Sequence, residues 1–576
     1  MYSDILLEIA ISKGLIKNKE LAETEKLSKY INLKYDTHLH DADKIKDIDI
    51  AINIMRNAIK EQKKIAIYAD YDCDGIPGAT ILSEFFDKIN YNNYLVYIPH
   101  RHNEGYGIHI AAIDKLVEQG VVLMITIDLG ITNVKEIAYA KERGIQVVLT
   151  DHHLPIRDEQ GKQIIPNADA VVNMKRDDCK YTDKNLCGCA TIWKVIKAFI
   201  KKYGDDFDIE QSWEKTLLDM VALSTVADMV PLIGENRALA HFGMKVLKIS
   251  KRSGLNRILS NAKENKIKIN EETIGFAIAP RLNSASRMDD PRIAFLTLSD
   301  KINGHMHADK LEMLNINRKA AVKDSMTEIN DTHINDEIIL ITNSEWNPGI
   351  LGLISSRVVE QQGRMTLVAG GRDDEGNYKG SVRSAHENEN VVQVLSEVSD
   401  LLIHFGGHEA AGGFKVHESN IEMLRQKLND IAKTKGLERE SLYKMQDTSN
   451  KTQDTNNKLK NNFDIKLIHE SINNNLYEEI KLLGPFGMGN AAPSICVNGT
   501  YKISFFGKRK EHMEIKYISL RAIKFFASNE DILNAEAGKM PIINLAWDSY
   551  RDDIVGRIIA FNAPFGELAS GGTTMD

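Results

Sequence analysis

Cysteine and long apolar runs are both scarce in this chain. Its 576 residues include five cysteines, an odd number that does not make a disulfide framework, so we expect reduced cysteines and a cytoplasmic protein. Cys187 and Cys189 lack the second cysteine pair of a typical zinc site. No apolar run reaches the roughly 18 residues of a transmembrane helix, and the first residues lack the basic start of a secretion signal. These absences argue against a secreted disulfide scaffold and a membrane-spanning protein.

An excess of positive charge is also missing. The net charge is −8, which argues against a uniformly basic nucleic-acid binder but allows a local channel built from a few Arg and Lys residues. The length suggests three or four domains of about 100–200 residues each. Composition therefore predicts an ordinary multidomain globular chain, and the function has to be inferred from its motifs.

Metal-ligand residue types follow three apolar, strand-like runs. The runs are residues 64–69, 121–127 and 145–150, and they end respectively in Asp70 with Asp72, Asp74 and Gly75, in Asp128, and in Asp151-His152-His153. Gly75 permits a sharp turn after the aspartates. In an open parallel α/β sheet the carboxyl ends of the strands line one crevice, so these side chains should converge. Such a cluster suits two hard divalent cations, and two cations suit phosphodiester hydrolysis.

The charge of this cluster supports a metal site. With a later candidate, Asp228, the strand-end aspartates would place five negative charges in one pocket, where unpaired carboxylates raise each other's pKa and destabilise the fold. The alternative is that the Asp-rich turn is a solvated loop, which weakens when a DHH triplet and a separate strand-end aspartate occur in the same α/β unit. Asp228 could instead cap a helix, but an acid in apolar surroundings needs a partner, and a metal is a good one.

These motifs resemble those of the DHH phosphoesterases, and within them the RecJ-type single-strand exonucleases. The segments that look like the first four DHH motifs are 70–75 (DYDCDG), 128–131 (DLGI), 151–153 (DHH) and 224–232 (STVADMVPL). The segments that narrow the match to the RecJ type are 99–101 (PHR), 104–107 (EGYG), 280–288 (PRLNSASRM), 347–352 (NPGILG), 379–384 (KGSVRS), 406–413 (GGHEAAGG) and 485–490 (PFGMGN). This ordered series is far more specific than a DHH triplet alone.

Periodicity and resemblance together predict an α/β fold with several domains. The expected order is a helical N-terminal extension (1–50), a parallel-sheet DHH catalytic domain (51–235), a helical connector (236–335), a second α/β domain of the DHH-associated (DHHA1-like) type (336–435), a polar linker (436–466) and an OB-like, nucleic-acid-binding β-barrel (467–576). The extension shows the spacing of an amphipathic helix, which we expect to dock on the domain that follows it.

The resemblance also implies how the cluster holds its cations, which would be Mn²⁺ or Mg²⁺. Asp70 and Asp72 would bind one cation, Asp74, His152 and Asp228 the other, and Asp128 both. His153 would contact the scissile phosphate, unless it is a structural histidine. Asp151 would orient an imidazole without binding metal itself. His153, Asp151 and Asp128 are therefore the expected catalytic residues.

Further residues are implied to bind the DNA between two lobes, since arginine suits bidentate phosphate binding. The expected substrate contacts are Arg281, Asn283, Arg287, Ser381, Arg383, Gly406, Gly407 and His408. Each has a structural alternative, because arginines often pair with acids and glycine runs often form turns. The expected path of the single strand includes Tyr106, Phe506, Lys508 and Arg509. The aromatic residues of the C-terminal domain could equally belong to its core.

The function that the resemblance implies is a two-metal 5′-to-3′ exonuclease, which hydrolyses single-stranded DNA to nucleoside 5′-monophosphates in DNA repair or recombination. A single-strand-binding protein or a helicase would be its partner. One alternative is a DHH phosphodiesterase for short oligonucleotides or cyclic dinucleotides, but those relatives are shorter and commonly have His where this chain has Asp70. Another is a non-catalytic replication scaffold, which is disfavoured because every expected ligand type is present.

Overall fold

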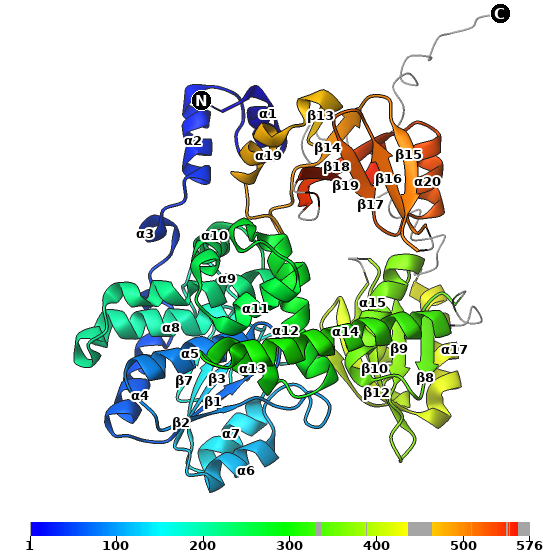
Figure 1. The fold of residues 1–576 in the computed structure, drawn as a ribbon. Coiled ribbons are helices and arrows are strands. Elements are labelled where there is room, and N and C mark those ends of the chain that lie inside the picture. Colours follow the sequence, from blue (N-terminus) through cyan, green and yellow to red (C-terminus); the bar gives the residue numbers. More distant parts are fainter. Residues whose placement is uncertain are drawn as a thin grey trace, which may run out of the picture.

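The computed structural model describes residues 2–329, 334, 336–386, 389–435, 463–508, 510–548, 551 and 553–562. Most of the expected polar linker and Arg509 lie outside these residues. The described chain has four parts, a parallel-sheet domain, a bundle of helices beside it, a second sheet domain and a C-terminal sheet domain (Figure 1). None of its described helices is both long and apolar enough to cross a membrane. The predicted α/β class is confirmed.

The first domain is built on a five-stranded parallel sheet in the order β2-β1-β3-β4-β7. Its strands are β1 (Ile65–Ala69), β2 (Tyr94–Tyr97), β3 (Leu123–Ile127), β4 (Gln146–Thr150) and β7 (Ala170–Val172), and a short hairpin of β5 (Ile156–Arg157) and β6 (Gln163–Ile164) follows β4. β1 and β3 are buried along their whole length, which is typical of a sheet covered on both faces. The three apolar runs of the sequence thus become the three central strands.

Helices cover both faces of this sheet. One face packs against α4 (Ile48–Lys60), α5 (Gly75–Lys88) and α8 (Gly188–Tyr203), and the other against α6 (Ile110–Glu118) and α7 (Val134–Glu142). Because side chains alternate along a strand, Ile67 joins the first of these cores and Tyr68 the second. α5 begins directly after the end of β1, so its first turn lies at the carboxyl edge of the sheet.

A bundle of helices connects this domain to the second lobe. It contains α9 (Leu218–Ala227), α10 (Gly234–Ile249), α11 (Ser253–Asn261), the π-helical turn η5 (Thr273–Ile278), α12 (Ala279–Met288), α13 (Arg292–Ser299) and α14 (Gly304–Glu328). α14 runs from the bundle to the second sheet domain (Figure 1), where Val322 packs with Ile339 and Val368. This long helix fixes the spacing of the two lobes.

The second lobe contains a mixed five-stranded sheet in the order β11-β12-β10-β9-β8. Its strands are β8 (Ile339–Asn343), β9 (Thr366–Gly370), β10 (Asn377–Arg383), β11 (Leu402–Gly407) and β12 (Ala411–His417), and its helices are α15 (Leu351–Gln362), α16 (Val391–Glu397) and α17 (Ile421–Lys435). It touches the first domain directly, because Lys379 Nζ donates to the backbone oxygen of His102 at 2.7 Å.

The C-terminal domain is a seven-stranded sheet in the order β13-β14-β18-β19-β17-β16-β15. Its strands are β13 (Ile465–Ile468), β14 (Ile495–Asn498), β15 (Lys502–Phe506), β16 (His512–Lys516), β17 (Arg521–Lys524), β18 (Met540–Asp548) and β19 (Asp553–Asn562), with helices α19 (Asn474–Lys481) and α20 (Asn529–Glu536). Apart from the parallel pairs β13–β14 and β17–β19, neighbouring strands are antiparallel.

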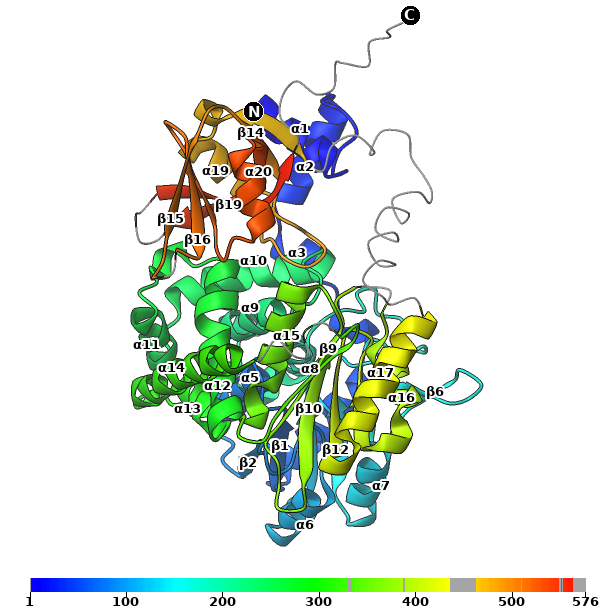
Figure 2. The same cartoon turned by 90° about the vertical axis from the view of Figure 1, so that its right-hand side faces the viewer.

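The N-terminal helices pack on this C-terminal domain, so the prediction that they dock on the domain that follows them is wrong. α1 (Asp4–Ser12) and α2 (Leu21–Ile31) bury Leu6, Ile9 and Leu27 in one core with Ile465 and Leu476, and Figure 2 shows these helices beside the C-terminal sheet. The short helix α3 (Tyr35–His38) then leads back to the first domain. An amphipathic pattern identifies a buried face but not the surface that covers it.

Candidate metal centre and nuclease site

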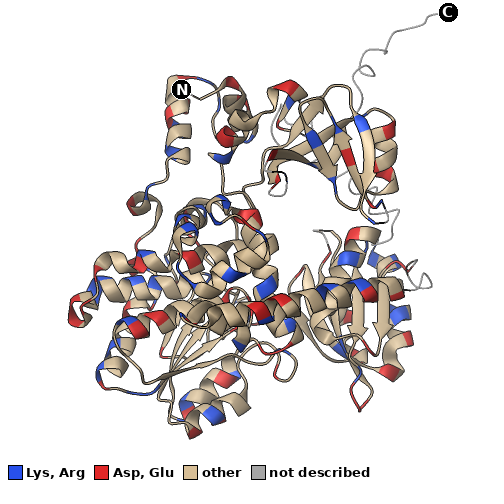
Figure 3. Ribbon diagram, in the orientation of Figure 1, with Lys and Arg blue, Asp and Glu red and all other residues tan. Residues whose placement is uncertain are grey.

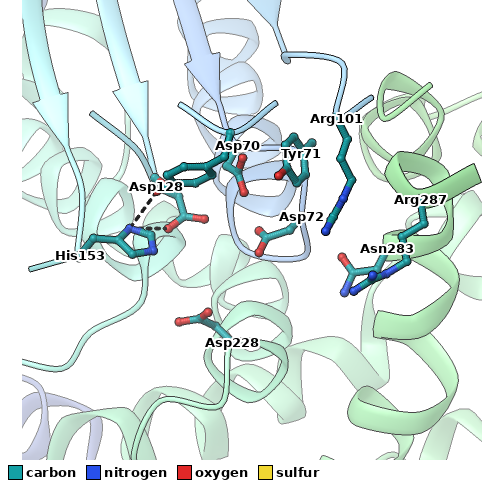
Figure 4. Close-up of a pocket in the computed structure, with 10 residues that line it drawn as sticks. Asp70, Tyr71, Asp72, Arg101, Asp128, His153, Asp228, Asn283 and Arg287 are labelled. Carbon is teal, nitrogen blue, oxygen red and sulfur yellow. Dashed lines mark hydrogen bonds and ion pairs between the residues drawn. The ribbon is translucent and has the colours of Figure 1, made fainter. Parts of the chain in front are cut away.

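Three strand ends bring the expected metal ligands together. Asp70 follows β1, Asp128 follows β3, and Asp151 with His152 follows β4, so all four lie at the carboxyl edge of the parallel sheet. Asp228 comes from a different element, the carboxyl end of α9, where its backbone caps the helix. Figure 4 shows Asp70, Asp128 and Asp228 around one common space.

These side chains form three overlapping groups of possible ligands. The groups are Asp70-Asp72-Asp128, Asp74-His152-Asp228 and Asp128-His152-His153. Within each group, the ligand atoms lie within 4.8 Å of one another. His152 Nε2 lies 3.1 Å from Asp128 Oδ1 and 3.6 Å from a carboxylate oxygen of both Asp74 and Asp228. Asp128 therefore stands between the two sets of residues expected to hold the cations.

Several of these ligand atoms are buried without a hydrogen-bond partner. Among the described residues, Asp70 Oδ1, Asp128 Oδ1 and both ring nitrogens of His152 accept or donate no hydrogen bond. Buried polar atoms normally have a partner, and a cation would satisfy these. Carboxylates with one imidazole form a donor set that suits Mg²⁺ or Mn²⁺. The residues present thus fit a pair of hard divalent cations.

The electrostatics of the cluster also require compensating positive charge. Burial, followed by repulsion from neighbouring carboxylates, raises the pKa of Asp74 to about 6 and the pKa of Asp228 to about 9. The same causes raise the pKa of Asp70 and Asp128 well above the usual range. Such shifts disfavour the ionised forms that bind metal. Two divalent cations would reverse them by neutralising the mutual repulsion.

Close backbone packing holds the loop between β1 and α5. Gly75 lies so near Asp70 that a Cβ atom would overlap its backbone nitrogen and oxygen. Gly75 is not among the glycines with positive φ, so close approach rather than an unusual turn requires glycine here. Asp74 accepts hydrogen bonds from the backbone nitrogens of Gly188 (2.6 Å) and Cys189 (2.8 Å) at the start of α8. The helix dipole favours the carboxylate at that position.

His153 is held as a charged donor beside the cluster. Its Nδ1 lies 2.8 Å from Asp151 Oδ1. Burial would lower the pKa of His153, but the charge of Asp151 and this hydrogen bond raise it to about 9. Asp151 also accepts hydrogen bonds from the backbone nitrogens of Ile131 and His152 and belongs to none of the ligand groups. Burial lowers the pKa of His152 to about 3, which keeps that ring neutral and able to bind a cation.

A cavity of about 290 Å³ opens in front of the cluster. It is lined by Asp70, Tyr71, Asp72, Arg101, Tyr106, Asp128, His153, Asp228, Asn283 and Arg287. Acidic residues form one wall, and Arg101, Asn283 and Arg287 face them from the other (Figure 4). Burial and then nearby arginines, Arg101 first, lower the pKa of Arg287 to about 9. A metal cluster opposite these arginines suits a phosphate held between them.

This cationic wall is local. Basic and acidic residues are mixed over all parts of the ribbon (Figure 3), as expected from the net charge of −8. Among the ion pairs between described residues, none includes Arg101 or Arg287, although Arg287 Nη1 donates to the backbone oxygen of Gly349 at 3.0 Å. The two guanidinium groups therefore keep their charge for a ligand in the cavity.

The second lobe places one of the expected substrate contacts, His408, against His153. His408 stacks on His153, with ring centroids 6.2 Å apart and planes inclined by 9°. Arg383 Nη1 donates to Ser381 Oγ at 3.0 Å, and both residues lie on β10. Gly406 and Gly407 end β11, next to His408. On the first domain, the Tyr106 hydroxyl lies 3.4 Å from His153 Nδ1.

Arg281 and the residues expected in the C-terminal domain lie elsewhere. Arg281 is buried, pairs with Glu312 and donates to the backbone oxygen of Ala277, so it is not among the cavity residues. Phe506 ends β15 and Lys508 lies in the turn that follows it, both in the C-terminal domain. The Phe506 side chain is partly exposed and contacts His512, with ring centroids 5.0 Å apart.

Two cavity residues were given no role by the sequence. Tyr71 lies between two of the expected ligands, and the guanidinium of Arg101 lies 5.0 Å from the centre of its ring. Both belong to motif segments, 70–75 and 99–101. Membership of a motif was therefore the signal that could have identified them.

Comparison with known proteins gives three matching family models. They are the DHH family N-terminal domain (residues 64–225), the DHHA1 domain (335–434) and the RecJ OB domain (463–553). Together they match parts of the first domain, the second lobe and the C-terminal sheet, whose last strand, β19, lies almost entirely beyond the third match. The resemblance deduced from the motifs is confirmed.

Similar proteins carry the same family name. The chain is 32% identical over 488 residues to the single-stranded-DNA-specific exonuclease RecJ of Bacillus subtilis, a match that covers 83% of this chain but only 58% of that relative. It is 30% identical to the RecJ of Haemophilus influenzae, covering 81% and 80% of the two chains. The crystal structure of Thermus thermophilus RecJ with Mn²⁺ has the same fold, with a TM-score of 0.73 at 21% identity over 97% of this chain and 76% of that one. This chain therefore belongs to the RecJ family of single-stranded-DNA-specific exonucleases.

Proposed function

We propose that this protein degrades single-stranded DNA from its 5′ end and releases nucleoside 5′-monophosphates, in DNA repair or recombination. The observation that carries the proposal is the ligand cluster that faces two arginines across one cavity. The names of the relatives support the substrate. The direction and the product are supported by the family resemblance alone.

The proposed cofactors are two divalent cations, Mn²⁺ or Mg²⁺. RecJ structures from Thermus thermophilus carry one or the other. Asp70 and Asp72 would hold one cation, Asp74, His152 and Asp228 the second, and Asp128 would contact both. When bound, such a pair supplies an activated water and stabilises the charge of the departing oxygen. The chain itself then needs no nucleophile, and its carboxylates serve to position the cations.

The chain's own donors would bind and orient the scissile phosphate. His153 is protonated at neutral pH, and because Asp151 engages its Nδ1, its Nε2 is the nitrogen that would donate to a phosphate oxygen. Arg101 and Arg287 would hold phosphate oxygens from the opposite wall. The Asn283 amide, which lines the same wall, would add a neutral donor.

The second lobe would close the site around the strand end. His408 already lies against His153, and Ser381 and Arg383 offer a hydroxyl and a guanidinium on β10. Tyr106 would lie along the strand where it enters. A single-strand-binding protein or a helicase is the partner we propose, since the substrate must be presented without its complement.

A nuclease assay tests the proposal. A 5′-labelled single strand is incubated with the protein and Mn²⁺, beside Asp74→Ala and a blunt duplex. We expect immediate release of the label as a mononucleotide, with none from the variant or the duplex. A labelled ladder that shortens gradually would mean the opposite direction. Cleavage of dinucleotides alone would favour the short-substrate phosphodiesterase, and no cleavage of any substrate would contradict the proposal.

A further inference from the structure

Asp228 differs from the other expected ligands because it does not follow a strand of the parallel sheet. It ends α9, and residues 229–233 join it to α10. Two hydrogen bonds fasten the middle of this segment. Asn236 Nδ2 donates to the backbone oxygen of Pro231 at 3.2 Å, and the backbone nitrogen of Leu232 donates to the backbone oxygen of Met488 at 2.7 Å. The acceptor of the second bond belongs to residues 482–490, the loop that joins α19 to β14 within the C-terminal domain.

The 482–490 loop packs against this segment at the level of the backbone. A Cβ on Gly487 would come within 2.8 Å of Leu232 Cδ1. A Cβ on Gly489 would come within 3.3 Å of Pro231 and 3.4 Å of Ile233, and Gly489 has a φ of +71°. A side chain at position 487 would therefore have to displace Leu232, and the positive φ of Gly489 favours glycine at that position.

Asn490 fixes the shape of the loop from within. It is 6% exposed, and its Nδ2 donates to the backbone oxygens of Leu483 (3.1 Å) and Pro485 (2.8 Å). Its backbone nitrogen and oxygen pair with those of Gly487 at 3.0 Å each. The carbonyl of Met488, which receives the Leu232 bond, is thus presented by a closed and internally bonded turn.

Arg237 on α10 of the helical bundle contacts both the same loop and the N-terminal helices. This buried residue of α10 donates to the backbone oxygens of Gly484 and Tyr30, each at 2.7 Å, and its guanidinium lies 3.9 Å from the centre of the Tyr30 ring. Tyr30 belongs to α2, which packs on the C-terminal domain. The 482–490 loop of the C-terminal domain and the N-terminal helix α2 therefore both contact one side chain, nine residues after Asp228 in the sequence.

We propose that the 482–490 loop is a positioning element for Asp228, through which the C-terminal domain and the N-terminal helices set the cation affinity of the catalytic centre. The inference rests on the metal role of Asp228 in the proposed function. No atom of the loop lies in the ligand groups, so its effect is indirect. Groups that orient metal ligands without touching the metal commonly change metal affinity by about 10–100-fold when they are altered.

The test compares two buried or partly buried asparagines that each hold the chain near the C-terminal sheet. Asn490→Ala removes the bonds that shape the loop. Asn544→Ala is the matched control, because Asn544 Nδ2 likewise donates to two backbone oxygens, of Ala492 and Pro493, but lies beyond the loop. Mn²⁺ is titrated into the metal-free full chain, with free Mn²⁺ followed by electron paramagnetic resonance. We expect about 10-fold weaker binding at one site in Asn490→Ala and wild-type binding in Asn544→Ala.

Two further measurements separate the possible failures. Asp228→Asn should weaken the same site, and unchanged Mn²⁺ binding in that variant would overturn the metal role of Asp228 itself. If Asp228→Asn weakens binding but Asn490→Ala does not, the positioning role of the loop is wrong. Hydrogen exchange at the Leu232 amide gives a readout that does not depend on activity. Exchange should be faster in Asn490→Ala than in Asn544→Ala. If Asn490→Ala does not fold, Gly489→Ala takes its place, and its exchange should likewise be faster than that of Asn544→Ala.

Discussion

Replacing His153 by glutamine tests the role of its positive charge. The Asp151 carboxylate raises the pKa of His153 to about 9, so the imidazolium is present below that pH and is lost as the pH rises through it. A hydrogen bond from a charged donor contributes about 1.5–3 kcal/mol. Because each 1.36 kcal/mol is a factor of ten, we expect kcat/KM of His153→Gln to fall about 10- to 100-fold at pH 7.

The pH profile separates this charge from a structural effect. The ratio of wild-type to His153→Gln activity should be highest where the imidazolium is present and fall as the pH rises through the pKa of His153, which bound cations would lower from about 9 by repelling its charge. Single-strand hydrolysis is measured with Mg²⁺ from pH 6.5 to 10. The pH dependence of cation binding is common to both proteins and therefore cancels in the ratio. His408→Gln is the control, because burial and then His153 lower the pKa of His408. A ratio for His153→Gln that does not change with pH would show that the positive charge of His153 does not contribute to hydrolysis.

Other substitutions and additions test other parts of the molecule. Gly188→Ala would place a Cβ 2.8 Å from Asp128 Oδ1, so Mn²⁺ binding measured by calorimetry should weaken about 10–100-fold. Arg287→Lys loses the planar fork that binds two phosphate oxygens, so KM for single strands should rise several-fold while kcat changes little. Mn²⁺ at about 100 times its dissociation constant should stabilise the first domain by about 2.7 kcal/mol in thermal unfolding. The same concentration should not stabilise Asp128→Asn. Leu6→Ala should lower the free energy of unfolding of the C-terminal domain, measured in urea, by about 2–5 kcal/mol. An unchanged free energy of unfolding would contradict the shared core.

The sequence predicts the catalytic edge of the fold well because its signal is local. Each apolar run is long enough for one buried strand, and each ends in ligand types, so parallel pairing alone brings Asp70, Asp128 and His152 to one place. Because five acids and an imidazole share this site, acceptors greatly outnumber donors. Both ring nitrogens of His152 and Asp70 Oδ1 are therefore buried without a hydrogen-bond partner. Neither observation needs knowledge of the other domains.

Contacts between distant segments were much harder to predict. The spacing of Leu6 and Ile9 indicates a buried helix face, but the C-terminal residues that cover it lie more than 450 positions away. Arg281 shares a motif with Arg287, yet only Arg287 reaches the cavity, because Glu312 on α14 pairs with Arg281. A motif shows that a residue lies near the site. Whether its side chain reaches the cavity depends on partners from other helices, which the motif does not reveal.

The coupling between the two ends of the chain has a physical basis. The N-terminal helices and the C-terminal sheet share one core, so they should move together as a unit. Arg237 on α10 donates to a backbone oxygen of each part of this unit, Tyr30 on α2 and Gly484 in the 482–490 loop. Through Arg237 and the Leu232–Met488 hydrogen bond, this unit contacts both α10 and the segment that follows Asp228.

Anomalous scattering from Mn²⁺ in crystals of the protein would test the proposed two-cation centre most directly. We expect two peaks, one among the carboxylates of Asp70, Asp72 and Asp128, and one among Asp74, Asp128, His152 and Asp228. Both should be lost or weakened in crystals of Asp128→Asn. A single peak, or peaks away from the carboxyl edge of the parallel sheet, would contradict the proposed two-cation centre.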